Sequence, residues 1–139
     1  MANCTIAGNR SRFNQAVFAA GGTILNTIIA GNIATEIEGT SIWGGGASTN
    51  IFSYCVTDNE EKINPTCRVG TANVIFENFA AGDYRLGYSS PAINIGPKLT
   101  AQKAAAAGFD LLGRPRVIDY RVDAGCYERK GRTTTVIVR

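Results

Sequence analysis

Short runs of β-branched and apolar residues recur in the first sixty residues, and glycines and polar residues separate them. Residues 3–9 read NCTIAGN, residues 26–32 read NTIIAGN and residues 53–59 read SYCVTDN. Runs of this kind predict short strands bounded by turns. The closing asparagines are 23 and 27 residues apart, and a repeat of this length is typical of stacked units that bury their apolar faces against one another.

An apolar position recurs in the same register, because Ile6, Ile29 and Val56 each precede the closing asparagine by three residues. Neither a leucine framework nor the three- and four-residue spacing of amphipathic helices accompanies it. The repeat therefore predicts an all-β fold, a parallel β-helix with a few coils in residues 1–73. Equivalent side chains would stack about 4.8 Å apart along its axis.

The closing asparagines Asn9, Asn32 and Asn59 are predicted to form an internal ladder. Asparagine tolerates left-handed backbone geometry, and its amide can accept from one coil while donating to another. The alternative is that they are three unrelated turn residues.

From residue 74 onwards the repeat stops, and residues 74–139 are predicted to form a C-terminal cap continuous with the same domain. Thr100 would N-cap one short helix over 101–107, and Gly108 would close it. The β-branched run at 133–139 would add a last strand.

Several motifs follow one another in this cap: Phe76 with Asn78, Gly82–Leu86, Ser90–Gly96, Asp110 with Gly113 and Arg116, and Val122–Glu128. In this order they resemble the C-terminal part of bacterial right-handed parallel β-helix proteins of the choice-of-anchor Q type. Cys126 stands where that family usually has alanine. The resemblance implies a right-handed, single-stranded β-helix, export, and attachment to the cell surface through a sequence farther downstream.

Asp110, Arg116, Asp123 and Glu128 are the chemically suggestive residues of the cap. Paired carboxylates can act as acid and base, and an arginine can hold an anionic substrate. Asp-x-x-Gly, however, is typical of a turn in which the carboxylate accepts backbone N–H groups, and Arg116 could pair with Asp110 or Glu128. We therefore interpret these four residues as structural, and no catalytic residue is assigned.

The positive charge lies near the C-terminus: residues 1–113 carry 7 Lys/Arg and 8 Asp/Glu, whereas residues 114–139 carry 7 and 3. Arg129, Lys130 and Arg132 could attract phosphate or an anionic glycan, or could simply form a solvated tail. No nucleic-acid motif accompanies them, so no nucleic-acid partner is predicted. Trp43 is a candidate platform for a sugar ring, with ordinary packing as the alternative.

The four cysteines contain no CxxC pair, and the chain has no histidine. A zinc site is therefore not predicted, and neither is any other metal or cofactor. Buried free thiols are favoured, since Cys4 and Cys55 lie in strand-like runs. Two disulfides in an oxidising compartment are the alternative.

No signal peptide or membrane-spanning segment is visible. The opening resembles the middle of a repeat, so Met1 is expected to begin a fragment whose export signal lies upstream. The exposed edge of the first coil would then allow a homodimer.

Three functions remain open at this point. The first is a noncatalytic exported module, secreted, periplasmic or on the cell surface, that binds polysaccharide or is structural. The alternative is the C-terminal fragment of a polysaccharide lyase or glycoside hydrolase, for which Asp58, Glu60, Glu61 and Lys62 form the densest charged loop. The third is an intracellular scaffold without a ligand.

Overall fold

The computed structural model describes residues 1–12, 22–35, 50–58, 65–100, 102–103, 107–118 and 120–130. Predicted features at Trp43, at Asn59, at 60–62 and at 131–139 lie outside the described residues. The strands are β1 (Thr5–Ala7), β2 (Arg10–Ser11), β3 (Gly22–Leu25), β4 (Ile28–Ala30), β5 (Ile33–Ala34), β6 (Asn50–Ser53), β7 (Val56–Thr57), β8 (Arg68–Val69), β9 (Phe76–Asn78) and β10 (Asp83–Leu86). A one-turn helix, α1 (Ala72–Ile75), and a 3₁₀ turn, η1 (Phe79–Ala81), flank β9.

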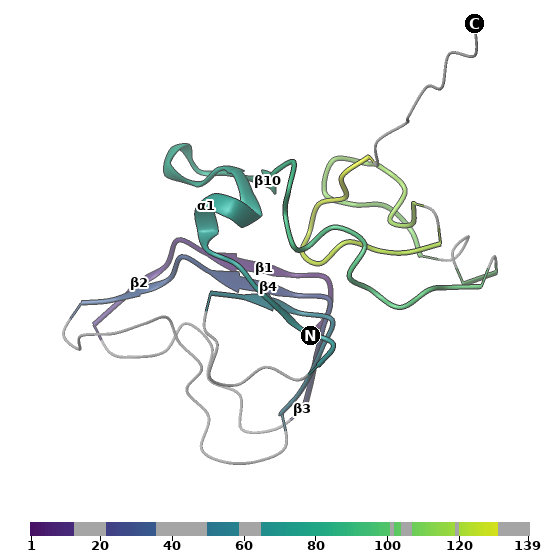
Figure 1. Ribbon diagram of the computed structural model, residues 1–139, viewed down its shortest axis with the longest axis horizontal. Coiled ribbons are helices and arrows are strands. Elements are labelled where there is room, and N and C mark those ends of the chain that lie inside the picture. Colours follow the sequence, from purple (N-terminus) through teal and green to yellow (C-terminus); the bar gives the residue numbers. More distant parts are fainter. Residues whose placement is uncertain are drawn as a thin grey trace, which may run out of the picture.

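These strands form several small sheets (Figure 1). One sheet has four parallel strands in the order β1-β4-β7-β8, and two further parallel pairs are β2-β5 and β3-β6. The pair β9-β10 is antiparallel. The described part of residues 107–130 follows as irregular loops beside the sheets, joined by isolated bridges.

The prediction of a right-handed single-stranded parallel β-helix is wrong. The described residues form sheets of two to four strands, parallel and antiparallel, and no strand exceeds four residues. The repeat correctly indicated parallel pairing between its copies, because equivalent apolar runs pack in equivalent positions. It could not predict the segment after β8, where the chain turns into a helix and an antiparallel hairpin.

The predicted register is right for the first two copies and wrong for the third. Ile6 pairs with Ile29, as expected, but Ile29 then pairs with Thr57, and Val56 pairs with Ile28. Successive side chains of a strand point to opposite faces, so a slip of one residue exchanges the faces. Ile28 and Val56 are both fully buried in the main apolar cluster, and this shared burial fixes the observed register.

The turns before three of the four strands of this sheet carry a left-handed backbone, which the described closing asparagines, Asn9 and Asn32, do not adopt. Asn3, Asn26 and Tyr54 precede β1, β4 and β7 with φ of 53°, 47° and 55°. At the other end of the first two copies, Gly8 and Gly31 are left-handed instead. In the first two copies asparagine therefore takes the left-handed position at the start of the repeat and is free to hydrogen-bond at its end.

Asn9 and Asn32 do lie together. The Asn32 side-chain oxygen accepts from the Asn9 backbone N–H at 3.0 Å and from the Asn9 amide at 2.9 Å, while the Asn32 amide donates to the Ile6 carbonyl at 2.9 Å. Asn32 is buried and Asn9 is exposed. The next contact along the sheet comes from Asp58, whose carboxylate accepts from the Gly31 N–H.

The apolar core lies where the four-stranded sheet meets α1, the β9-β10 hairpin and residues 92–95 and 124. Phe76, Phe79 and Tyr84 pack against one another with ring centroids 5.3 to 6.0 Å apart. Residues 122–126 cross this region and hydrogen-bond to its turns: Ala124 N–H donates to the Ala92 carbonyl.

Gly125 fixes how closely this crossing segment approaches the sheet. Its φ is +93°, and a Cβ there would lie 2.7 Å from both Ile28 Cδ1 and Thr5 Oγ1. The Gly125 N–H donates to the Asn26 carbonyl at 2.8 Å, and the next N–H donates to the Thr5 hydroxyl at 3.1 Å. Only glycine combines this backbone conformation with this contact.

The helix predicted over 101–107 is described only in part. The Thr100 hydroxyl accepts from the Lys103 N–H at 3.4 Å, and Gly108 is left-handed. The helix α1 was not predicted, because four residues are too few for a periodic pattern. Within the described part of the chain, no helix has the length and apolar character needed to cross a membrane.

All four cysteines are free thiols. Cys55 and Cys67 are buried in a second apolar cluster, whereas Cys4, expected to be buried, is partly exposed, as is Cys126. Two effects raise the pKa of the Cys55 thiol far above its ordinary value: a hydrogen bond with Cys67, which is the larger, and burial. The Cys55 thiol is therefore protonated at neutral pH, and both buried cysteines pack as apolar side chains.

The Asn32 contacts predict unequal effects of two substitutions. Asn32→Ala removes a buried amide, leaves the partly buried Asn9 donors and Ile6 carbonyl without their partner, and should cost about 2–3 kcal/mol of unfolding free energy. Asn9→Ala removes an exposed amide and should cost about 1 kcal/mol or less. Urea unfolding of both variants measures the difference. Equal losses would contradict a structural role for Asn32 as the shared acceptor.

Candidate functional site

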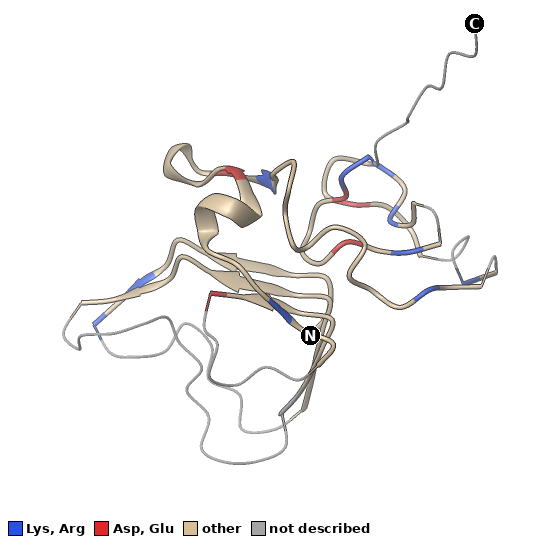
Figure 2. Cartoon of the chain, viewed as in Figure 1, with Lys and Arg blue, Asp and Glu red and all other residues tan. Residues whose placement is uncertain are grey.

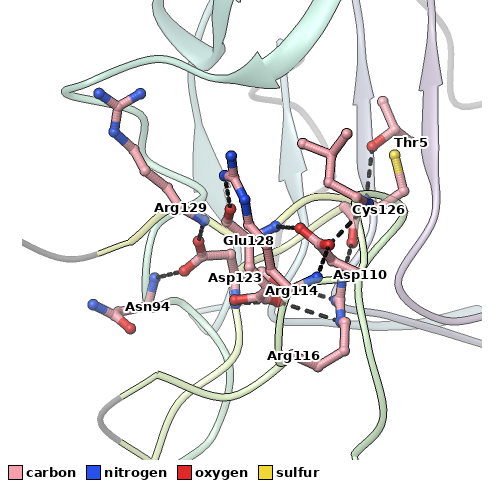
Figure 3. Close-up of polar contacts among 11 residues, drawn as sticks. Thr5, Asn94, Asp110, Arg114, Arg116, Asp123, Cys126, Glu128 and Arg129 are labelled. Carbon is pink, nitrogen blue, oxygen red and sulfur yellow. Dashed lines mark hydrogen bonds and ion pairs between the residues drawn. The ribbon is translucent and has the colours of Figure 1, made fainter.

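Buried charged groups organise the described loops of residues 107–130. We call Asp110, Arg116, Asp123 and Glu128 the carboxylate network; their exposed fractions are 8%, 5%, 1% and 2%. The network holds all four residues for which the sequence suggested either chemistry or a structural role. Figure 3 shows them gathered at one place where the loops converge.

Asp110 closes a turn with both carboxylate oxygens. Its Oδ1 accepts from the backbone N–H groups of Leu112 at 2.8 Å and Arg114 at 2.7 Å, and its Oδ2 accepts from the Glu128 N–H at 2.9 Å. This is the arrangement that Asp-x-x-Gly predicts, with Gly113 left-handed at φ +75°. Although burial raises the pKa of Asp110, the three backbone donors outweigh it, and the pKa is lowered overall.

Arg116 pairs with Glu128 and not with Asp110. Its Nε lies 3.3 Å from Glu128 Oε1, a contact whose geometry falls short of a hydrogen bond. The rest of the guanidinium donates to backbone carbonyls, those of Gly125 at 3.0 Å and Asp123 at 3.4 Å. The buried arginine therefore ties the loop to itself.

Asp123 and Glu128 hold the loop in the same way. The Asp123 carboxylate accepts from the N–H groups of Asn94 at 2.7 Å and Arg129 at 2.6 Å. Both Glu128 oxygens accept from the Asp123 N–H, at 3.2 and 3.1 Å. Across the network, the carboxylates serve mainly as acceptors for backbone groups that no sheet or helix satisfies.

Burial dominates the protonation of two of these groups. Burial raises the pKa of Asp123, against backbone hydrogen bonds from Arg129 and Asn94. Burial, together with the charge of Asp123, raises the pKa of Glu128 to about 8. Glu128 is therefore mostly neutral at pH 7, which relieves the repulsion between two buried carboxylates.

A pocket of about 320 Å³ opens beside the network, between the β9-β10 hairpin and residues 127–130. We call it the basic pocket; it is lined by Glu77, Arg85, Leu86, Arg114, Tyr127, Glu128, Arg129 and Lys130. In Figure 2, basic segments lie both in the hairpin and in the facing loops, with acidic segments between them. In Figure 3, the side chains of Arg114 and Arg129 extend to the same side of the network.

The basic pocket was only partly predicted. Arg129 and Lys130 belong to the basic cluster noted in the sequence, but Arg132 lies outside the described residues. Arg85 and Arg114 were missed because they are 29 residues apart in sequence and the fold brings them together. The one local signal, which applies to Arg114, is the density of arginines after residue 113.

A second hollow lies on the other side of the hairpin. It measures about 300 Å³ and is lined by Gly8, Arg10, Gly31, Ile33, Phe79, Ala80, Gly82 and Tyr84. Its charged lining consists of one arginine. Among the described residues, no group of three or more Asp, Glu or Cys side chains is placed to hold a metal ion.

No model of a known protein family matches the chain, and the search of curated proteins finds none similar to it. The resemblance of the C-terminal motifs to the choice-of-anchor Q proteins therefore stays a prediction. The β-helix that it implied is excluded by the observed sheets.

The raised pKa of Glu128 predicts a stability that falls with pH. Between the ordinary value near 4.5 and the folded value of about 8, the folded protein binds the extra proton, so stability is lost as pH rises through this window. The loss amounts to about 1.4 kcal/mol per pH unit at most. Glu128→Gln mimics the neutral acid and should flatten the dependence.

Urea unfolding at pH 6 and pH 8.5 measures this effect in both proteins. The charged groups around Glu128 are Asp123, Arg116 and Asp110, and they are the same in the variant. An equal slope in wild type and variant would show that another group causes the pH dependence.

Proposed function

We propose that this chain is a noncatalytic module of an exported or cell-surface protein, one that binds polysaccharide without turning it over. The observation that carries the proposal is the use of the carboxylate network. Asp110, Asp123 and Glu128 are buried, and their oxygens accept from backbone N–H groups. A general acid or base must reach a substrate proton within about 3 Å, and these oxygens are already engaged by backbone N–H groups.

Export and surface attachment rest on the resemblance to the choice-of-anchor Q proteins alone. The order of five motifs from Phe76 to Glu128 supports it. The network explains several of those motifs physically, since their Asp, Arg, Gly and Glu positions are the ones that build the loops.

The alternative, the C-terminal fragment of a polysaccharide lyase or glycoside hydrolase, has one observation in its favour. Glu128 lines the basic pocket, and a pKa of about 8 would keep it protonated as a general acid. Its second carboxylate would have to be Glu77, which is engaged by Arg129 at 2.9 Å.

An assay of reducing ends and of unsaturated products separates the two functions. Polygalacturonate, alginate and xylan are incubated with the wild type and with Glu128→Gln. We expect no product from either protein. Each carboxylate of the described network already accepts from backbone N–H groups, so none is free to act together with a second carboxylate as acid and base. Product that forms with the wild type and disappears with Glu128→Gln would establish the enzyme and overturn the proposal.

A further inference from the structure

The basic pocket has the size of a small-ligand site. At about 320 Å³ it lies at the lower end of the roughly 300–1,000 Å³ typical of such sites. Its two walls come from different parts of the chain: Glu77, Arg85 and Leu86 from the hairpin, and the remainder from the loops. A ligand would therefore bridge the hairpin and the loops, which Arg129 already joins through Glu77 and the Leu86 carbonyl.

Four basic side chains line the pocket against two acidic ones. Glu77 is paired with Arg129, and the buried Glu128 accepts from the Asp123 N–H. Lys130 is exposed, and Arg114 uses Nη1 alone, on the Glu128 carbonyl at 3.3 Å. Within the described residues, the Lys130 ammonium and the remaining Arg114 donors are left for a ligand.

The other two arginines are held in place. Arg85 Nε donates to Asp83 at 2.8 Å, and this pairing lowers the pKa of Asp83 to about 2. Arg129 donates to Glu77 and to the Leu86 carbonyl, and its guanidinium lies 5.5 Å from the centre of the Tyr88 ring. Side chains ordered before binding lose less conformational entropy when a ligand arrives.

The mixture of groups restricts the ligand. Arg and Lys donors suit carboxylate or sulfate oxygens. The Glu77 carboxylate disfavours a dianionic phosphate but accepts hydrogen bonds from hydroxyl groups. Tyr127, which also lines the pocket, offers an apolar face with a polar edge. A nucleic acid would instead need a continuous basic surface, whereas two of the residues that line this pocket, Glu77 and Glu128, are acidic.

We propose that the basic pocket binds an anionic sugar unit, carrying a carboxylate or a sulfate, of an acidic polysaccharide. Arg114 and Lys130 contact the anionic group, and Glu77 accepts from a ring hydroxyl. This inference deepens the proposed function and rests on it, since it names the ligand that the module holds without turnover.

Isothermal titration with defined oligosaccharides tests the proposal. The ligands are a trigalacturonate, a heparin-derived tetrasaccharide and neutral maltotriose, and the matched variants are Lys130→Glu and Lys103→Glu. Both lysines are exposed, and both substitutions change the net charge by the same amount. We expect at least one anionic ligand to bind and maltotriose not to bind.

Lys130→Glu should weaken binding at least tenfold and Lys103→Glu less than twofold. Preference for trigalacturonate or for the heparin fragment identifies carboxylate or sulfate as the anion. The proposal is overturned if neither anionic ligand binds, if maltotriose binds equally well, or if the two variants weaken binding equally. Displacement by a short RNA at the same concentration would also overturn it.

The same samples are assayed for product, which separates this inference from the proposed function. Binding without product supports both. Binding with product overturns the noncatalytic function and leaves the ligand assignment standing. Absence of binding and of product overturns the ligand assignment alone.

Discussion

Every backbone N–H that folding removes from water needs an acceptor, and the loops of residues 107–130 have little sheet or helix to provide one. The chain meets this constraint with carboxylates. Asp110, Asp123 and Glu128 together accept from backbone groups on both sides of each turn. Arg116 supplies the compensating charge and directs its other donors to carbonyls. The form of this whole segment depends on these contacts.

The backbone groups at the ends of the short strands need partners as well, and the sheets provide them in a different way. Their strands are two to four residues long, so much of each repeat consists of ends and turns. Asn32 accepts at one such end, and Asn26 adopts the left-handed backbone at another. Residues 122–126 then join the two halves, because Gly125 and Cys126 donate to groups just before and within the first strands. The segment that contains Asp123 of the carboxylate network is thus hydrogen-bonded directly to the repeat.

The sequence predicted local features well and their assembly poorly. Equal spacing correctly paired Ile6 with Ile29, because both copies have the same length. The strand of the third copy pairs one residue out of the predicted register, since burial of Val56 against Ile28 outweighs the similarity of the aligned sequences. The prediction of a β-helix was wrong because a sequence repeat predicts that neighbouring copies stack, but it does not predict the hairpin and loops that follow β8. Asp-x-x-Gly indicated the Asp110 turn because its chemistry is local, whereas the choice of Glu128 over Asp110 as the partner of Arg116 depends on the fold.

The basic pocket depends on both the network and the hairpin. The network fixes Arg114 and Glu128, the hairpin fixes Arg85, and Arg129 spans the gap between them. Among the described residues, most charged groups around the pocket are already paired or hydrogen-bonded, and the Lys130 ammonium and some Arg114 donors are not. This arrangement suits ligand binding better than proton transfer. Native-state amide hydrogen exchange tests the carboxylate network most directly. If the carboxylates are structural acceptors, the amides of Leu112, Arg114 and Glu128 are protected as well as those of Ile28 and Val56 in the sheet; rapid exchange at all three would contradict the account.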